Sequence, residues 1–238
     1  IFLIIGYNIS VHIVFMYMIR SVMIMSKTNM IITIGRQFGS GGREIGMKLA
    51  KDLDIGFYDK EMLERASKDS GICKELFETH DEKPTSSFLY SLVMDTYSMG
   101  YSSSTYTDMP LNHKVFLAQF EAIKKIAEEG PCVLVGRCAD YALESYENVL
   151  NVFIRADLES RIRRIARDTD STDAKAKDLI IKQDKKRASY YNYYTNKRWG
   201  DAESYDLCLN SSKLGIDGTV EAIKDVLARC ETTGKVVL

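Results

Sequence analysis

The sequence predicts an α/β domain in which a parallel sheet is flanked by helices on both faces. Two observations support this prediction. Short apolar runs typical of buried strands alternate along the chain with longer amphipathic segments typical of helices. The first strand also runs into a glycine-rich turn that opens a helix, as in phosphate-binding P-loops. We therefore expect a three-layer P-loop NTPase fold, and 238 residues suffice for one such domain with a sizeable core.

The glycine-rich turn follows a β-branched run at 31–34. Its glycines are Gly35, Gly39, Gly41 and Gly42. An amphipathic helix comes next, with Ile45, Leu49 and Leu53 spaced four residues apart on its apolar side. Glycine lets the backbone approach a phosphate closely, and a helix start directs N–H groups at the anion. The turn therefore predicts a phosphate site, with an ordinary glycine-rich strand–helix turn as the alternative.

The turn departs from the usual P-loop pattern G-x4-G-K-[ST], in which the lysine binds the β and γ phosphates and the hydroxyl binds Mg²⁺. Gly35 is followed by five residues before Gly41, and Gly42, Arg43 and Glu44 come next. The lysine and hydroxyl positions are therefore not filled as expected. Arg43 could supply the missing cation, although its planar guanidinium is not equivalent to an ammonium group.

Composition excludes several classes of function. A net charge of −1 argues against a dedicated nucleic-acid-binding protein. The five cysteines form no C-x-x-C pair, which favours a reduced, cytoplasmic protein. The three histidines are too few and too scattered for a metal cluster, and no Ser-His-Asp arrangement is visible.

The N-terminal segment is unusually apolar. Residues 1–19 carry no Asp, Glu, Lys or Arg, which is long enough for a membrane span. Three interpretations stay open for 1–25: an over-extended reading frame, a membrane anchor, or an extra helix or strand packed on the domain. We treat 1–29 as an apolar extension and 231–238 as a tail, and we expect contact with a membrane only if 1–25 is a genuine anchor.

A short second strand is expected within 53–59, ending at Asp59, with a helix at 60–68. Arg65 lies six residues after Asp59, about one and a half helical turns further on. Both side chains would face the sheet edge beside the glycine turn, where ligands of open α/β sheets bind. The alternative is a helix-capping aspartate and a solvated arginine.

The segment 69–112 has no clear periodicity and is rich in serine and threonine. We interpret it as a partly helical flap over the acceptor site, with a plain insertion as the alternative. Later elements are expected in this order: a helix at 114–129, strands at 132–135 and 149–154, helices at 157–167 and 173–187, a strand at 205–210 and a helix at 216–227.

Two of these later segments bear on function. Gly136 and Arg137 follow the strand at 132–135, so Arg137 should lie at the edge of the glycine turn and face an anion; a structural ion pair is the alternative. Basic residues of 173–187 precede tyrosines at 190–194, a combination able to stack on single-stranded nucleic acid. We favour the other interpretation, in which the tyrosines pack a helix onto the core.

With these elements in order, the chain resembles the cytidylate kinase-like family of P-loop nucleoside monophosphate kinases over about residues 30–230. The glycine turn at 35–46 is similar to the phosphate loop of that branch. Asp59 with Arg65 resembles an aspartate and an arginine of cytidylate kinases, in which the arginine binds the acceptor phosphate. The segment 205–216 is similar to the family's terminal strand and the turn after it.

The remaining similarities involve the acceptor site and the lid. Arg137 resembles the arginine of a Gly-Arg-Asp element that contacts the acceptor, although Cys138 stands at the aspartate position. Asp184 and Arg187 resemble the Asp-x-x-Arg of the lid that closes on the transferring phosphate. A further lid arginine, expected four residues before Asp184, is Ile180.

The resemblance implies a kinase that uses ATP and Mg²⁺ to phosphorylate CMP or dCMP. The implied catalytic residues are Arg43, Asp184 and Arg187. The implied ATP-binding residues are Gly39, Ser40, Gly41, Gly42, Arg43, Glu44, Arg163 and Arg164. The implied acceptor-binding residues are Asp59, Arg65 and Arg137. Asp59 and Asp140 are candidates for orienting Mg²⁺ through water.

The kinase domain is expected at 30–230, with the flap at about 69–112 and a lid at about 163–200. Two other functions remain open. One is a P-loop kinase of another small-molecule acceptor, because the flap does not resemble the usual CMP-binding insertion. The other is a non-catalytic nucleotide-binding regulator, or a nucleic-acid-associated module that uses 182–199.

Overall fold

Five parallel strands form a single sheet in the order β2-β3-β1-β4-β5. The computed structural model describes residues 28–59, 61–71 and 111–233. The strands are β1 (Ile31–Arg36), β2 (Gly56–Tyr58), β3 (Cys132–Val135), β4 (Val149–Arg155) and β5 (Leu207–Asn210). The helices are α2 (Gly42–Leu53), α3 (Glu61–Ser70), α7 (Leu111–Glu129), α8 (Ala139–Ala142), α9 (Leu158–Asp168), α10 (Asp173–Thr195) and α11 (Ser211–Thr233).

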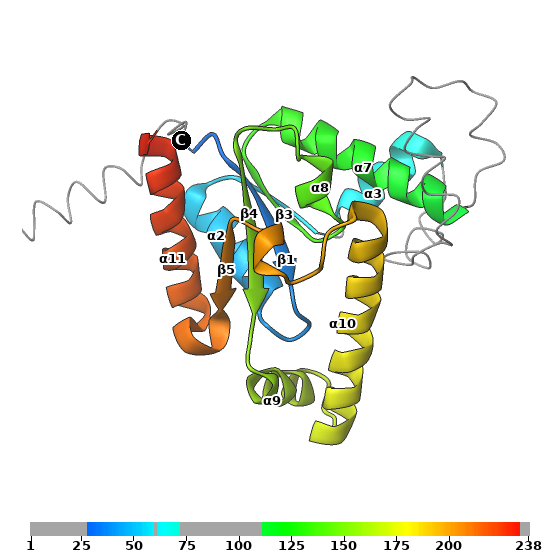
Figure 1. Cartoon of the computed structure of the whole chain (residues 1–238), viewed down its shortest axis with the longest axis vertical. Coiled ribbons are helices and arrows are strands. Elements are labelled where there is room, and N and C mark those ends of the chain that lie inside the picture. Colours follow the sequence, from blue (N-terminus) through cyan, green and yellow to red (C-terminus); the bar gives the residue numbers. More distant parts are fainter. Residues whose placement is uncertain (1–27, 60, 72–110, 234–238) are drawn as a thin grey trace, which may run out of the picture.

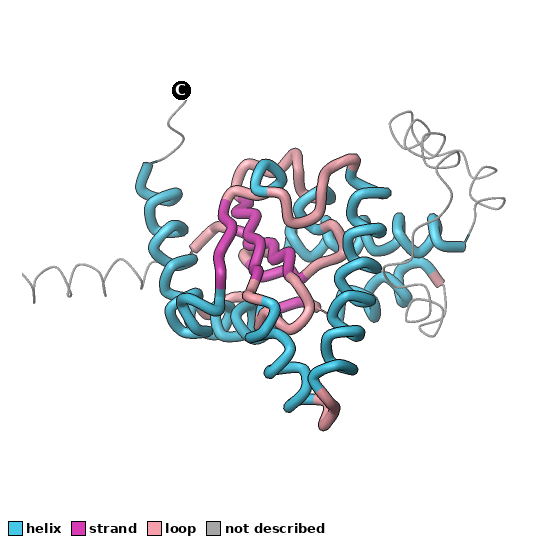
Figure 2. The backbone as a smooth tube through the Cα atoms, turned by 60° about the horizontal axis from the view of Figure 1, so that its bottom comes forward, coloured by secondary structure: helices cyan, strands magenta, loops and turns pink. Residues whose placement is uncertain are grey.

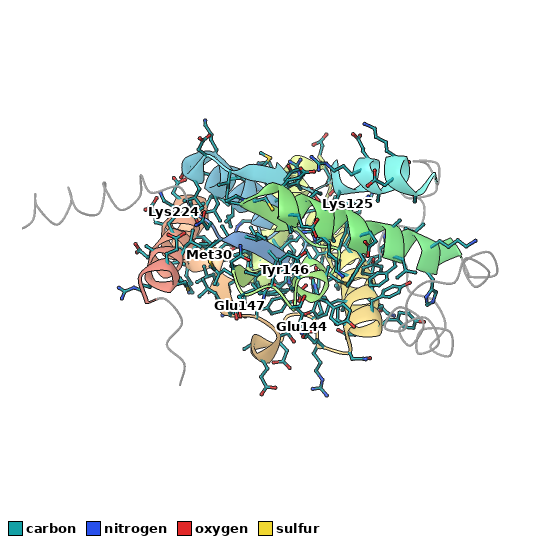
Figure 3. All side chains as sticks on the ribbon, turned by 90° about the horizontal axis from the view of Figure 1, so that it is seen from above. Met30, Lys125, Glu144, Tyr146, Glu147 and Lys224 are labelled. Carbon is teal, nitrogen blue, oxygen red and sulfur yellow. The ribbon has the colours of Figure 1, made fainter. Side chains whose placement is uncertain are left out.

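The sheet lies between two helical layers, which confirms the predicted three-layer α/β class (Figure 1). Side chains alternate between the faces along β1, as the two-residue period of a strand requires. Ile32 and Ile34 pack against α2 and α11, whereas Ile31 packs with α7 and α8 on the other face. Viewed from above in Figure 3, Lys224 of α11 and Lys125 of α7 lie on opposite sides of Met30, which leads into β1.

Two predicted boundaries shift for physical reasons. The second strand covers only Gly56–Tyr58, because α2 continues to Leu53 and Asp54 caps it in the left-handed conformation at φ 53°. The predicted helix at 173–187 continues to Thr195, so the tyrosines belong to α10. Tyr190 and Tyr194 pack against Phe116 of α7 and Tyr191 is buried in the same cluster, as in the packing interpretation.

Helices α9 and α10 form a pair that stands off the carboxyl end of the sheet (Figure 2). Ile165 of α9 and Ile180 of α10 are buried together, and Phe38 of the glycine turn packs against this cluster. Ile180, at the position where the resemblance expects an arginine, is 1% exposed and therefore serves this packing. The pair is thereby joined to the loop that follows β1.

Several predictions lie outside the described residues. These concern the extension at 1–27, most of the flap at 72–110, and the tail from 234. Within the ranges that the structure covers, no helix is both long and apolar enough to cross a membrane.

Candidate functional site

A hollow of about 580 Å³ opens at the carboxyl end of the sheet, beside β1. Strand β1 lies between β3 and β4, so the chain leaves the sheet in different directions from neighbouring strands. Crevices at such switch points are the usual ligand sites of open α/β sheets. The volume also falls in the range of small-molecule pockets, about 300–1,000 Å³.

The glycine turn forms one wall of this hollow, together with the first turn of α2. Gly39 and Gly41 have φ of 80° and 79°, a conformation that only glycine adopts without strain. Helix α2 begins at Gly42, and Gly41 offers no side-chain cap to its first N–H groups. An anion in the hollow would therefore meet the positive end of a helix.

The turn is held from outside by side chains of other elements. Gln37 bridges to β4: its N–H donates to the Ile154 carbonyl at 3.0 Å, and its Oε1 accepts from the Ala156 N–H at 3.0 Å. The Phe38 N–H donates to Asp184 Oδ1 of α10 at 2.7 Å. On the far side, the Ser211 hydroxyl donates to the Ser40 carbonyl at 2.7 Å. These contacts fix the path of the loop before any ligand binds.

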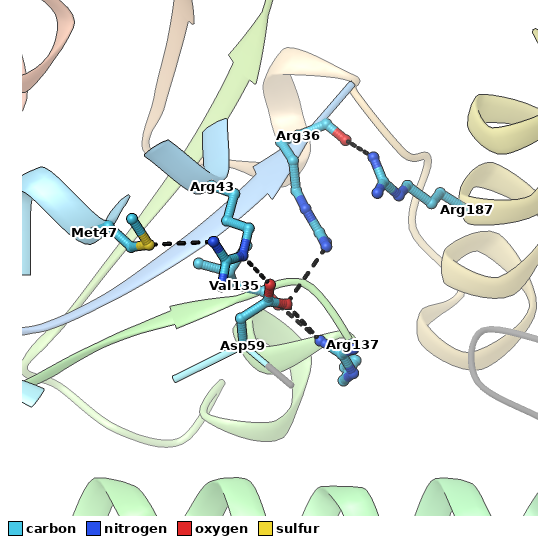
Figure 4. A network of polar contacts seen from close by, with 7 residues as sticks. All are labelled: Arg36, Arg43, Met47, Asp59, Val135, Arg137 and Arg187. Atoms are coloured by element: carbon cyan, nitrogen blue, oxygen red, sulfur yellow. Dashed lines mark hydrogen bonds and ion pairs between the residues drawn. The ribbon is translucent and has the colours of Figure 1, made fainter. Parts of the chain in front are cut away.

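A buried carboxylate surrounded by arginines forms the floor of the hollow (Figure 4). Asp59 is 4% exposed. Arg43 Nε donates to its Oδ2 at 2.9 Å, Arg137 Nη1 donates to its Oδ1 at 2.9 Å, and Arg36 Nη2 lies 3.8 Å from Oδ1. Three positive charges thus face one carboxylate, so the cluster carries excess positive charge.

The same arrangement sets the protonation state of Asp59. Burial acts to raise the pKa of this carboxyl, but the charges of Arg137 and Arg36 and hydrogen bonds from Arg137 and Arg43 outweigh it. The pKa of Asp59 therefore lies below its ordinary value, and the group is ionised at neutral pH.

The position of Arg137 depends on unusual backbone after β3. Gly136, Arg137 and Cys138 have φ of 79°, 55° and 55°, all left-handed. For the two residues other than glycine, this conformation costs on the order of 1–2 kcal/mol each. The turn directs the Arg137 side chain back under the sheet edge, where Nη1 also contacts the Val135 carbonyl at 3.3 Å. Strain of this kind is typical of binding sites.

Helix α10 supplies the opposite wall. Arg187 Nη1 donates to the Arg36 carbonyl at 3.3 Å, and its guanidinium lies 5.5 Å from the centre of the Phe38 ring. Asp184 accepts from the Phe38 N–H and forms an ion pair with Arg161 Nη1 at 2.5 Å. Asp184 and Arg187 therefore connect α10 directly to the glycine turn.

Most of the predicted site residues line one hollow. These are Gly39, Gly41, Gly42, Arg43, Glu44, Asp59, Arg137, Arg164 and Arg187. Arg164 pairs with Glu44 at 2.8 Å across the mouth of the hollow. Ser40 is buried behind the turn and Asp184 lies behind Phe38. The sequence therefore indicates which residues gather at this hollow, but it does not indicate which partner each of them contacts.

Besides Ser40 and Asp184, three predicted residues do not line the hollow. Arg65 pairs with Glu129 at 2.5 Å and lies over the Tyr58 ring, because its place on α3 faces α7. Arg163 is exposed on α9 and contacts Ser160. Asp140 is buried and lines a different cavity, which Arg137 also lines. In this structure, the expected contact of Arg65 with the acceptor side of the site is therefore absent.

Asp140 belongs to a separate, small cavity of about 20 Å³, room for about one water molecule. The Tyr191 hydroxyl donates to its Oδ2 at 2.5 Å. Burial raises the pKa of the Asp140 carboxyl, and the hydrogen bond from Tyr191 offsets this only in part. Such a group suits a structural contact better than a metal ligand, which must be ionised.

We expect Asp140 to make the protein more stable in mild acid. A carboxyl with a raised pKa stabilises the fold fully below its unfolded pKa of about 3.9, and this contribution is lost as the pH rises through the higher folded pKa. Asp140→Asn keeps an acceptor for Tyr191 and removes the ionisation. At pH 7 the variant should therefore be more stable than the wild type, and its stability should depend less on pH.

Urea unfolding at pH 4.5 and pH 7 measures this effect. Asp178→Asn, at an exposed position of α10, is the matched control and should change neither value. A variant at Asp140 that is less stable than the wild type at pH 7 would contradict the assignment.

Two arginines of the site are not indicated by the sequence pattern. Arg36 ends β1 and lines the hollow, and Arg161 of α9 holds Asp184. The signal for Arg36 is its position at the end of the first strand, but the resemblance offers no residue for comparison there. Arg161 is 8% exposed, unlike the other arginines of its helix. The sequence pattern of α9 does not show which of its four arginines is buried.

Metal binding by the protein alone has little support in this geometry. In the ranges that the structure covers, no group of three or more His, Cys, Asp or Glu side chains is placed to hold a metal ion. Both oxygens of Asp59 are already taken by guanidinium groups, so it fits poorly as a Mg²⁺ ligand. Glu44 is the carboxylate beside the first turn of α2, and its side chain is 55% exposed. It suits an ion that arrives with nucleotide phosphates.

The chain is similar to several known proteins. The model of the cytidylate kinase-like family matches residues 31–213. A cytidylate kinase from Methanococcus vannielii is 24% identical, with 83% of this chain and 99% of that protein covered. Among solved structures, an uncharacterized protein from Eubacterium ventriosum is 28% identical at a TM-score of 0.63, covering 83% and 98% of the two chains. A shikimate kinase from Bacteroides thetaiotaomicron is 16% identical at a TM-score of 0.49, with coverage of 83% and 98%.

Proposed function

The chain belongs to the cytidylate kinase-like family, and from this membership we propose that it transfers the γ-phosphoryl group of ATP-Mg²⁺ to the phosphate of CMP or dCMP. We expect the reaction to take place in the cytoplasm.

The charge of the hollow is the observation that carries this proposal. Its lining includes six cationic side chains, Arg36, Arg43, Arg137, Arg164, Lys186 and Arg187. Three carboxylates oppose them, Glu44, Asp59 and Asp168, so the excess is three positive charges. Phosphoryl transfer requires little covalent chemistry from a protein but needs positioned cations around the charge that spreads over the phosphoryl oxygens.

The geometry suggests a division of roles. The turn at 39–44 and the start of α2 would hold the donor phosphates, with Arg164 at the mouth of the hollow. Arg137, buried at the floor, would bind the acceptor phosphate. Arg187 would neutralise the group in transfer, while Asp184 positions the loop through Phe38. Glu44, which lines the hollow at the first turn of α2, would help to hold Mg²⁺, and the ion would supply positive charge to the donor phosphates.

We predict that the purified chain consumes ATP with CMP or dCMP as acceptor. The kcat/KM for these acceptors should exceed that for UMP, AMP and GMP by about 10²-fold or more, because a site that hydrogen-bonds one base leaves polar groups unpaired with another. Product formation is measured separately for each acceptor at millimolar Mg²⁺, with an assay lacking acceptor as the control for ATP hydrolysis.

Each other outcome has a definite meaning. Turnover with a different acceptor would overturn the assignment of CMP as the acceptor and leave the assignment of kinase activity in place. The buried Cys138, standing where the resemblance expects an aspartate, is the feature that favours such a change. Binding of ATP without turnover on any acceptor would reject the kinase and support a nucleotide-binding regulator.

A further inference from the structure

The first glycine and the lysine of the P-loop pattern are exchanged for an arginine and a glycine in this chain. Counting the pattern G-x4-G-K-[ST] with Gly41 as its second glycine places Arg36 at the first glycine. The same count places Gly42 at the lysine and Arg43 at the hydroxyl. The loop therefore lacks a cation at residue 42, the lysine position, and has one at residue 36, at its opposite end.

The stem of Arg36 takes the space of the missing side chain. A Cβ added at Gly42 would lie 2.6 Å from Arg36 Cβ, closer than real Cβ atoms come to other atoms, and 3.1 Å from Arg36 Cγ, a tight contact. The backbone of Gly42 does not require glycine, because it lies in the first turn of α2. The absence of a side chain at residue 42 therefore matches the presence of a long one at residue 36.

A second glycine makes room for the guanidinium of Arg36. A Cβ added at Gly136 would lie 1.9 Å from Arg36 Nη1. The head group ends between the donor loop and the acceptor arginine, at 3.8 Å from Asp59 Oδ1 (Figure 4). That separation is a charge contact and is too long for a hydrogen bond. The side chain is 12% exposed, so its charge acts in a largely dry environment.

We propose that Arg36 replaces the P-loop lysine and binds the β and γ phosphates of the nucleoside triphosphate. The inference rests on the proposed function for the identity of the ligand. The Arg36 side chain begins at the other end of the loop, and its Cβ and Cγ lie beside Gly42, where the side chain of a P-loop lysine would start. Its planar guanidinium can bind two phosphate oxygens at once.

Arg43 is less suited to this task, although it follows the glycines directly. Its side chain is 54% exposed, its Nε is hydrogen-bonded to Asp59 and its Nη1 contacts Met47 Sδ at 3.2 Å. These contacts direct it along the side of α2. The cation that the motif lacks is therefore supplied from before the loop.

The test measures binding of the non-hydrolysable ATP analogue AMP-PNP by titration calorimetry. Arg36→Met keeps the aliphatic stem between the two glycines and removes the charge. We expect its Kd for AMP-PNP to rise by about 10- to 100-fold, as for a lost charge-assisted hydrogen bond. Binding of adenosine and of CMP should change by less than about threefold, well below that tenfold step. Lys51→Ala, at an exposed position of α2, is the control and should bind AMP-PNP as the wild type does.

A double-variant cycle then tests the exchange itself. Gly42→Lys alone should weaken binding, because the new side chain collides with Arg36. Arg36→Gly alone should also weaken binding. The two together restore the usual pattern and should bind AMP-PNP more tightly than either single variant. Urea unfolding of each protein separates lost binding from lost folding.

The outcomes distinguish this inference from the proposed function. Unchanged AMP-PNP binding in Arg36→Met would overturn the role of Arg36, and so would a loss confined to CMP. AMP-PNP binding that depends on Arg36, without turnover on any acceptor, would overturn the kinase activity and leave the role of Arg36 in place.

Discussion

Replacing Asp59 by asparagine is expected to lower the free energy of unfolding by about 3–5 kcal/mol, the usual cost of removing one partner from a buried ion pair. Asparagine keeps the shape of the side chain but leaves Arg137, whose side chain is 4% exposed, without its counter-ion. Arg36, 12% exposed, loses its charge contact as well. The destabilised cluster should then bind an anion, so inorganic phosphate should restore part of the lost stability.

The comparison is made by urea unfolding with and without phosphate. Asp69→Asn is the matched control, because Asp69 pairs with Lys125 at the surface and should contribute at most about 1 kcal/mol. The difference in the free energy of unfolding between the wild type and the Asp59 variant should become smaller in acid. A depressed pKa gives stability above about pH 3.9 that is lost as the pH falls through the folded pKa. A variant as stable as the wild type at pH 7 would show that the arginines do not need this carboxylate.

Replacing Arg187 by alanine is expected to lower kcat by about 10³-fold or more, the usual contribution of an arginine that stabilises charge on a phosphoryl group in transfer. Its guanidinium is held by the Arg36 carbonyl and the Phe38 ring, so it is already directed toward the glycine turn. The KM for ATP should change much less than kcat, because this charge develops mainly in the transition state.

Steady-state kinetics with the best acceptor measures this effect, and Arg187→Lys should recover only part of the rate. Lys185→Ala is the control, because this residue is an exposed cation on the same helix and does not line the hollow. Full turnover of Arg187→Ala would remove α10 from the catalytic machinery.

The fold was predictable because its signals are local. Buried parallel strands such as 132–135 are continuous apolar runs, and the helix after the glycine turn repeats its apolar residues every four positions. Boundaries were less predictable. The length of α10 depends on how Tyr190 and Tyr194 pack against Phe116 of α7, a contact that no local pattern encodes.

The site was predictable only as a set of residues. Glycines, Asp59, Arg137 and Arg187 could be named because each follows a strand or matches a family motif. The contacts of an arginine depend on the tertiary structure: Arg65 pairs with Glu129 of α7, and Arg161 contacts the Phe38 carbonyl and Asp184 without lining the hollow. Arg36 was missed because its role depends on the empty space above Gly42.

The span of each contact along the chain sets the order in which the hollow can assemble. The hydrogen bonds of Asp59 to Arg43 and to Arg137 join residues 16 and 78 positions apart in the sequence. Those of Phe38 to Asp184 and of Ser211 to the Ser40 carbonyl join residues 146 and 171 positions apart. Since synthesis proceeds from the N-terminus, the arginine cluster can form while the wall made by α10 is still unmade. Contacts of such long range also slow folding, because the entropy of loop closure is lost before the contacts can stabilise the fold. The loop that we propose holds the donor phosphates is therefore fixed in place last, after almost the whole chain has been made.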